Sequence, residues 1–227
     1  MKTLPGQIAR DLRGRLRDAH VATYNTLNTI FTGGLVAYLL RRVLEMPAAQ
    51  RPWLLVLASL LVIIACWSGL FRMLALVRYP SRITDALLSF ANAFAVYVMV
   101  TLLDGNPRAW LQAAAAVAFL GGLGTLSMLH GGRSDPFNDD VLALMGQDLR
   151  RTGFTRMAFA PLMLLLAASP LPDQVLSACA VLGAVLALVA DDFVWGRAVA
   201  QATHRELVAD ERASRPSPLG GADEARR

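Results

Sequence analysis

The chain has few of the residues on which soluble enzymes and metal sites usually depend. Of its 227 residues only two are cysteines and three are histidines, and 17% are charged. Cys66 and Cys179 lie inside long apolar runs and form no CxxC motif, so we expect packing residues rather than a disulfide or a metal pair. The histidines lie at or beyond the ends of such runs, which excludes a haem held between membrane helices.

Recognisable catalytic and nucleic-acid motifs are also missing. The sequence contains no HExxH, GxSxG or Walker pattern, and no cofactor is expected. The net charge is +5, but the basic residues do not form a patch interleaved with aromatic residues. A nucleic-acid partner is therefore excluded.

Charge is absent from six long stretches of the chain, although 55% of all residues are hydrophobic. These stretches are residues 19–40, 52–71, 86–103, 109–132, 157–172 and 174–190. About 20 apolar residues in a helix cross a hydrocarbon core about 30 Å thick. The first four stretches meet that length, and the last two need flanking residues or a thinner bilayer. The sequence therefore predicts an all-α, polytopic protein with six transmembrane helices in a lipid bilayer.

The basic residues predict the orientation of these helices. With the N-terminus inside, all 22 Lys and Arg residues lie on the inner side except Arg41, Arg42, Arg51 and Arg108. The positive-inside rule then makes both termini cytoplasmic, and the short outer links join the spans as three hairpins. The composition, rich in alanine and arginine, is typical of a bacterial protein and indicates the cell inner membrane.

Three regions are expected along the chain. They are a basic amphipathic helix at 1–18, a six-helix transmembrane domain at 19–200 with an inner loop at 130–156, and a disordered cytoplasmic tail at 201–227. The first region either lies on the inner leaflet or extends the first span. The loop is expected to hold a short amphipathic helix capped by Asn138 or Asp139.

Polar residues inside the apolar stretches are the first candidates for function, because they are expensive in a bilayer. Two stripes at helical spacing stand out, formed by Asn25, Asn28, Thr29 and Thr32 in the first span and by Asp85, Ser89 and Asn92 at the third. Both lie in the inner half of their helices and are expected to line one polar path. Alternatively they hold the bundle together by hydrogen bonds. Asp85 either pairs with Arg78 or Arg82 or binds a cation or a proton.

Small residues recur at four-residue steps in two other spans. The ridges are Ala114, Ala118 and Gly122 in the fourth span and Cys179, Gly183 and Ala187 in the sixth. Such ridges favour close helix packing, either within the chain or with a second copy or another membrane subunit. Asp191 is the next step of the second ridge and is expected to form a salt bridge with a loop arginine.

An acidic cluster in the inner loop allows a metal hypothesis. Asp135, Asp139 and Asp140 would hold Mg²⁺ on a phosphate substrate if they shared a helical face. Alternatively, Asp139 and Asp140 stabilise a helix N-terminus.

Three functions are consistent with this sequence. The favoured one is a channel or transporter with its polar path along the first and third spans. The alternative is a non-catalytic membrane subunit or scaffold of a larger complex. A further alternative is a metal-dependent membrane enzyme acting on a lipid-linked phosphate, and we do not favour an enzyme.

Overall fold

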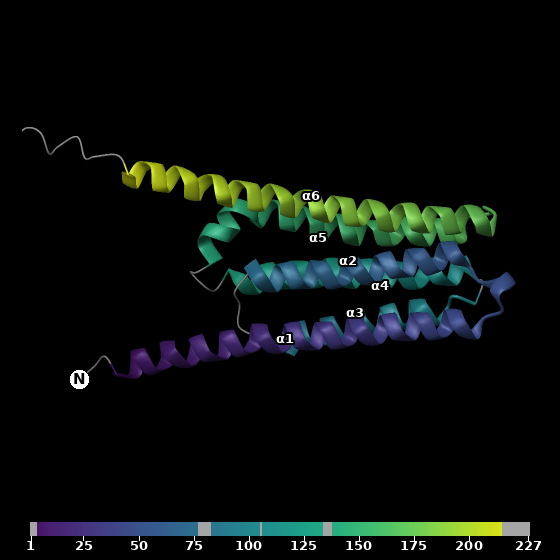
Figure 1. The fold of residues 1–227 in the computed structure, drawn as a ribbon, viewed down its shortest axis with the longest axis horizontal. Coiled ribbons are helices and arrows are strands. Elements are labelled where there is room, and N and C mark those ends of the chain that lie inside the picture. The colour runs from purple at the N-terminus through teal and green to yellow at the C-terminus, as the bar shows by residue number, and fades with distance from the viewer. Residues whose placement is uncertain (1–3, 77–82, 105, 134–137, 215–227) are drawn as a thin grey trace, which may run out of the picture. The chain divides into compact units, whose positions relative to one another are not determined.

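The computed structural model describes residues 4–76, 83–104, 106–133 and 138–214, and these form only helices (Figure 1). The helices are α1 (Leu4–Glu45), η1 (Ala48–Gln50), α2 (Trp53–Leu76), α3 (Ile83–Thr101), α4 (Pro107–Gly132), α5 (Asp139–Ala168) and α6 (Asp173–Ser214). The predicted all-α class is confirmed for the described residues. The chain divides into two compact units, Met1–Asp191 and Asp192–Arg227, and the cavities and ion pairs described below lie in the first.

Three of the described helices are long and apolar enough to cross a membrane. They are Trp53–Leu74 within α2, Pro107–Gly132 as α4, and Asp173–Val194 within α6, while α3 holds the shorter apolar stretch Ala86–Thr101. These helices indicate a membrane protein.

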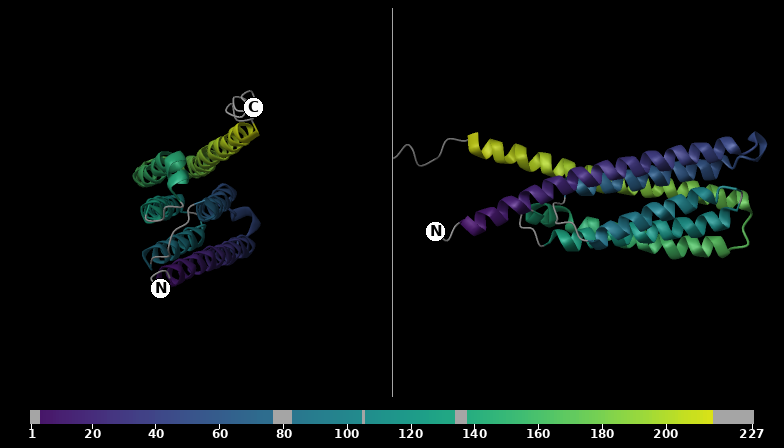
Figure 2. Two further views of the ribbon diagram at one scale, coloured as in Figure 1. Left: turned by 90° about the vertical axis from the view of Figure 1, so that its left-hand side faces the viewer. Right: turned by 90° about the horizontal axis from the view of Figure 1, so that it is seen from below.

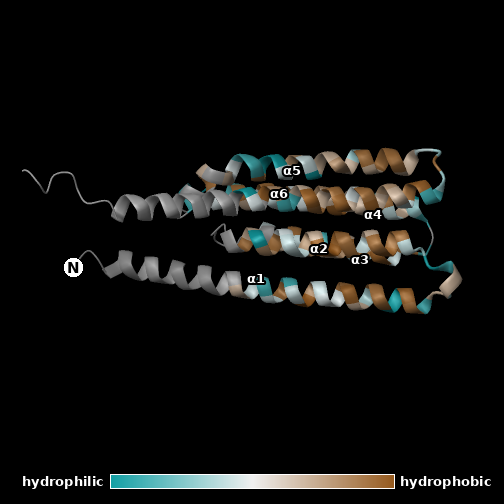
Figure 3. Cartoon of the chain, turned by 45° about the horizontal axis from the view of Figure 1, so that its top comes forward, coloured by the Kyte–Doolittle hydropathy of each residue, from teal (hydrophilic) through white to brown (hydrophobic). Residues whose placement is uncertain are grey.

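The described surface carries many large apolar side chains. Leu44, Leu165 and Phe94 are 74%, 70% and 67% exposed. In Figure 3, hydrophobic residues continue along the helices, and hydrophilic ones gather near the connections. A large apolar surface is unfavourable in water and is the ordinary surface of a protein in lipid.

Within Met1–Asp191 the helices run alongside one another and alternate in direction (Figure 2). Their core is apolar and includes Leu55, Met99 and Leu176, each less than 2% exposed. One polar pair lies within it, because the indole nitrogen of Trp110 on α4 donates a 2.9 Å hydrogen bond to Ser59 on α2. A buried indole N–H needs such an acceptor, and this bond sets α4 against α2.

Helices α4 and α5 approach most closely at two glycines. A Cβ atom added to Gly122 would lie 2.5 Å from the carbonyl oxygen of Gly153. Of the expected ridge on α4, Ala114 and Gly122 are buried and Ala118 is half-buried. Gly122 therefore lies at an α4–α5 contact in which the two backbones almost touch, and the packing role of Ala114 and Ala118 stays a prediction.

The buried face of α6 differs from the ridge expected there. Gly183 faces open space, and Cys179 and Ala187 are half-buried. Instead Ala180 and Ala184, one position further on, are buried at 3% and 5% exposure. Both sets have helical spacing and small side chains, so only the packing distinguishes them.

The expected connection between the fourth and fifth spans is shorter than predicted. α5 begins after Asn138, but it runs without a break from Asp139 to Ala168. The expectation of a separate amphipathic helix in the loop 130–156 is therefore wrong, because residues 139–156 and residues 157–168 of the expected fifth span belong to one helix. No proline occurs between residues 138 and 160 to end it, and Gly153 is held by its contact with α4.

The described segments near both ends of the chain belong to long helices. α1 is continuous from Leu4 to Glu45, so residues 4–18 extend the first span without a break. α6 continues to Ser214, beyond residue 200, where the disordered tail was expected to start. Residues 200–214 contain neither glycine nor proline, so nothing in that segment stops the helix.

The four arginines that depart from the charge asymmetry all lie at one end of the helices and all have partners. Arg41 Nε lies 2.7 Å from Glu45 Oε1, and Arg42 forms an ion pair with Asp104. Arg51 Nε donates a 3.1 Å hydrogen bond to a carbonyl of the preceding turn. None of the three is therefore a free charge.

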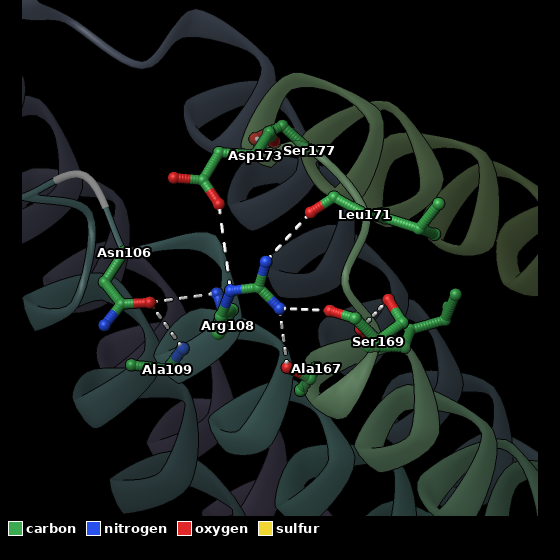
Figure 4. A network of polar contacts seen from close by, with 9 residues as sticks. Asn106, Arg108, Ala109, Ala167, Ser169, Leu171, Asp173 and Ser177 are labelled. Carbon is green, nitrogen blue, oxygen red and sulfur yellow. Dashed lines mark hydrogen bonds and ion pairs between the residues drawn. The ribbon is translucent and has the colours of Figure 1, made fainter.

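The fourth, Arg108, closes the link between α5 and α6 (Figure 4). Its guanidinium donates hydrogen bonds to the carbonyls of Ala167 at 3.1 Å, Leu171 at 2.8 Å, and Ser169, and its Nε lies 3.9 Å from Asp173 Oδ1. The last carbonyls of a helix have no partner within the helix, and Arg108 supplies one from α4.

Candidate functional site

A cavity of about 250 Å³ lies among α1, α2, α3, α4 and α5. Its lining is mainly apolar and includes Leu35, Ile63, Leu70, Met73 and Val96. The polar groups in this lining come from all five helices and include Asn28, Thr32, Cys66, Ser89, Asn92, Thr125 and Arg156. An apolar hollow with a few polar groups is the usual form of a small-molecule site.

The cavity unites part of each predicted polar stripe. Asn28 and Thr32 of α1 and Ser89 and Asn92 of α3 line it together, although 57 or more residues separate the two pairs in the sequence. On each helix the two lining residues are three or four positions apart and so share a face. These four residues of the two stripes line one cavity, and their role as a polar path stays a prediction.

The other members of the stripes do not line the cavity. Thr29 is exposed and donates a 2.9 Å hydrogen bond to the carbonyl of Asn25, one turn earlier. The Oδ1 atom of Asn25 is buried without a donor within the described part of the chain. The side chain of Asp85 lies outside the described residues, so the ion, proton and salt-bridge alternatives for it stay open.

Asn92 holds the most informative polar group of the cavity. Its Nδ2 lies 3.7 Å from Cys66 Sγ, a weak acceptor, while its Oδ1 is buried and receives no hydrogen bond from any described residue. Asn28, by comparison, donates from Nδ2 to the carbonyl of Trp67 at 3.4 Å. A buried oxygen without a donor is destabilising by about 1–3 kcal/mol, and a ligand carrying N–H or O–H would satisfy it.

An ion pair forms the buried end of the site. Arg156 of α5 bonds through Nη2 to Asp191 of α6, and its Nη1 lies 3.4 Å from Thr125 Oγ1. Thr125 donates in turn to the carbonyl of Gly121 at 2.9 Å. The Asp191 side chain is only 6% exposed, so the pair needs close partners to offset the loss of water. Because the two charges cancel, these two residues give the cavity no net charge.

A glycine makes room for this ion pair. A Cβ atom on Gly69 of α2 would lie 3.1 Å from Arg156 Nη2 and 3.7 Å from Asp191 Oδ2. Larger side chains at this position would press against both charged groups. Gly69 therefore lets three helices meet around one guanidinium.

The cavity reaches the surface of the described unit beside two phenylalanines. Phe31 of α1 and Phe90 of α3 line it and are still 38% and 52% exposed. Their rings meet edge to face, with centroids 5.4 Å apart. In contrast Ile63, Val96 and Thr125 are at most 7% exposed. The site therefore extends from a buried polar end to an aromatic mouth between α1 and α3.

The sequence analysis predicted that Asp191 forms a salt bridge, but it did not predict the residues that surround this salt bridge. We expected a loop arginine as the partner, and Arg156 is indeed at the end of that expected loop. The continuous α5 instead carries Arg156 inside the bundle, next to Thr125 and Gly69. No spacing in the sequence links these residues, because they come from four different helices.

The described residues give the metal hypothesis no geometric support. Among them no three His, Cys, Asp or Glu side chains are close enough to share a metal ion. Asp139 is exposed, whereas Asp135 and the side chain of Asp140 lie outside the described part. Cys66 and Cys179 are both free thiols.

Protein-family models, curated proteins and solved structures were compared with the chain, and none of them matches it. Its function therefore has to be inferred from the cavity and from the surface of the helices.

Proposed function

We propose that this protein is a multi-pass inner-membrane protein with six spans and cytoplasmic termini, and that it is transporter-like. Three membrane-capable helices and the exposed apolar residues support its placement in lipid. The pairing of Arg41, Arg42, Arg51 and Arg108 supports the orientation, because the only basic residues assigned to the outer side are neutralised or bound to carbonyls.

The transported molecule is a small neutral amphiphile with a hydroxyl-type head group. One observation carries this proposal: Asn92 Oδ1 lies buried at a cavity of about 250 Å³ with no described donor. Of the described residues in the lining only Arg156 is charged, and its ion pair with Asp191 neutralises that charge, so these residues do not attract an ion. A hydroxyl donating to Asn92, with its apolar part against Ile63 and Val96, matches the lining.

The volume limits the size of this ligand. An apolar cavity of about 150 Å³ is enough for benzene, so a volume of about 250 Å³ takes roughly ten non-hydrogen atoms. The exposed mouth at Phe31 and Phe90 faces the side on which lipid would lie. An amphiphile dissolved in the bilayer would enter there without crossing water.

The binding step is tested with 1-octanol and octane on the purified protein in detergent. A ligand that binds only the folded state raises the unfolding temperature, and the alcohol should do so more than the alkane. Asn92→Leu should remove the difference between the two compounds. Thr29→Val is the matched control, because Thr29 is exposed outside the cavity and its loss should leave the difference intact. Equal shifts by both compounds in the unmodified protein would exclude the hydroxyl-specific site.

Transport is tested separately by the accessibility of the cavity from both sides of the membrane. A Ser89→Cys variant, in a chain with Cys66→Ser and Cys179→Ser, should react with a membrane-impermeant thiol reagent in right-side-out and in inside-out vesicles. Native Cys179, which does not line the cavity, is the comparison in a Cys66→Ser chain. Reaction from neither side would favour the alternative, a non-catalytic membrane subunit or scaffold, with a second copy or another subunit as partner.

A further inference from the structure

A second hollow, separate from the first, lies between the end of α4 and the first half of α5. Its volume is about 350 Å³, and its lining residues are Leu129, Arg133, Leu142, Gly146, Gln147 and Arg150. We infer that this basic hollow binds the phosphate group of an anionic phospholipid in the cytoplasmic leaflet. None of its residues lines the transport cavity.

The charges of the hollow are suited to a phosphate. Arg133 and Arg150 are both exposed, and neither forms an ion pair within the described part of the chain. Their neighbour Arg151, which does not line the hollow, lies 3.8 Å from Asp148. Among the described residues that line the hollow, none carries a carboxylate. The guanidinium groups of Arg133 and Arg150 and the amide of Gln147 provide hydrogen-bond donors in this hollow. A guanidinium group can bind two oxygens of one phosphate at once.

The depth of the hollow matches a lipid head group, an argument that rests on the proposed membrane placement of α4. From Arg108, at the outer end of α4, to Leu129 is a rise of about 32 Å at about 1.5 Å per residue. This is close to the thickness of the hydrocarbon core, about 30 Å. The hollow therefore lies where α4 leaves the apolar layer, and basic pockets at this depth on the cytoplasmic side favour anionic lipids.

The apolar part of the lining favours a phospholipid over a free phosphate ion. Leu129 is 6% exposed and Leu142 is half-buried, so one wall of the hollow offers apolar surface beside the two arginines. The glycerol and the first methylene groups of a phospholipid would cover this wall. A soluble phosphate compound would contact the arginines alone. Both ligands would therefore bind the arginines through a phosphate group, but only the phospholipid would also contact Leu129 and Leu142.

The test uses the full-length protein, purified in detergent and freed of lipid. Phosphatidylglycerol and phosphatidylcholine with the same acyl chains are added, and retained lipid is measured by native mass spectrometry. The unmodified protein should prefer phosphatidylglycerol by about tenfold or more, and Arg133→Gln with Arg150→Gln should remove the preference. Arg151→Gln removes the same charge outside the hollow and should keep it. Arg150→Lys, which retains the charge without the planar fork, should lose part of it.

Added inorganic phosphate distinguishes the source. No displacement of phosphatidylglycerol by millimolar phosphate supports a lipid site, and displacement supports the same arginine chemistry with a soluble phosphate as a competing ligand. Equal loss of preference in Arg151→Gln and in the double variant, or no preference in the unmodified protein, would overturn the inference. The difference between octanol and octane at the cavity should persist in the double variant, so failure here is distinct from failure of the proposed function.

Discussion

Arg156 on α5 and Asp191 on α6 form an ion pair between two helices, 35 residues apart in the sequence. The aspartate side chain is 6% exposed and the arginine side chain 25% exposed, so both charges are largely removed from solvent. Thr125 and Gly69 complete the surroundings from two more helices. The pair therefore connects four helices at the buried end of the cavity.

Removing one partner of this pair should destabilise the protein more than removing both. Asp191→Leu leaves Arg156 as a buried charge without its partner, and we expect a loss of about 3 kcal/mol in the free energy of unfolding. Arg156→Met with Asp191→Leu should recover most of that loss, because no unpaired charge remains. The measurement is unfolding of the purified protein in detergent. A double variant as unstable as the sum of the two single variants would contradict this account.

Adjacent glycines on α4 should respond differently to alanine. Gly122→Ala places a Cβ atom 2.5 Å from the backbone carbonyl of Gly153, and backbone cannot move aside cheaply. We expect a loss of about 2 kcal/mol or more in stability, as for other overpacked sites. Gly121→Ala is the control, since nothing lies within 4 Å of its new Cβ, and it should be neutral or slightly stabilising. Equal unfolding temperatures for the two variants would show that α4 and α5 do not meet this closely.

Arg108 should be needed for its geometry as well as for its charge. Arg108→Lys keeps the charge but cannot reach the carbonyls of Ala167, Ser169 and Leu171 together. We expect a loss of about 1–3 kcal/mol and faster amide exchange at the end of α5. Arg41→Lys is the matched control, because the Arg41 side chain is 74% exposed and bonds only to Glu45 among the described residues. If the two variants lost similar stability, Arg108 would contribute no more than an exposed surface arginine does.

The Arg41–Glu45 pair should be visible in a titration. The hydrogen bond from Arg41 lowers the pKa of the Glu45 carboxyl from its ordinary value of 4.5 in the folded protein. A lowered folded-state pKa stabilises the protein above the unfolded value, and this contribution disappears as the pH falls through the folded value. Because Glu45 is exposed, the effect on stability should be small and weakened by salt. NMR titration of Glu45 should show a higher pKa in Arg41→Gln, and an unchanged value would contradict the assignment.

Much of the helical pattern and four polar residues of the cavity lining could be predicted from the sequence. Uncharged apolar runs indicated helices, and the spacing of Asn28 with Thr32 and of Ser89 with Asn92 placed each pair on one face. The spacing did not separate these residues from Thr29, which belongs to the same stripe and points outward. A helix face is about a third of its circumference, and only the neighbouring helix determines which part of it is covered.

By itself, then, the sequence determined which segments are apolar and uncharged and that they are helical. These properties depend on composition and on local periodicity, so they can be read one segment at a time. The tertiary structure alone decided that α5 is one continuous helix carrying Arg156 to Asp191, that Gly69 lies against this ion pair, and that Gly122 lies where a Cβ atom would meet the backbone of α5. Such contacts join distant segments through packing in three dimensions, and no periodicity within a single helix specifies them.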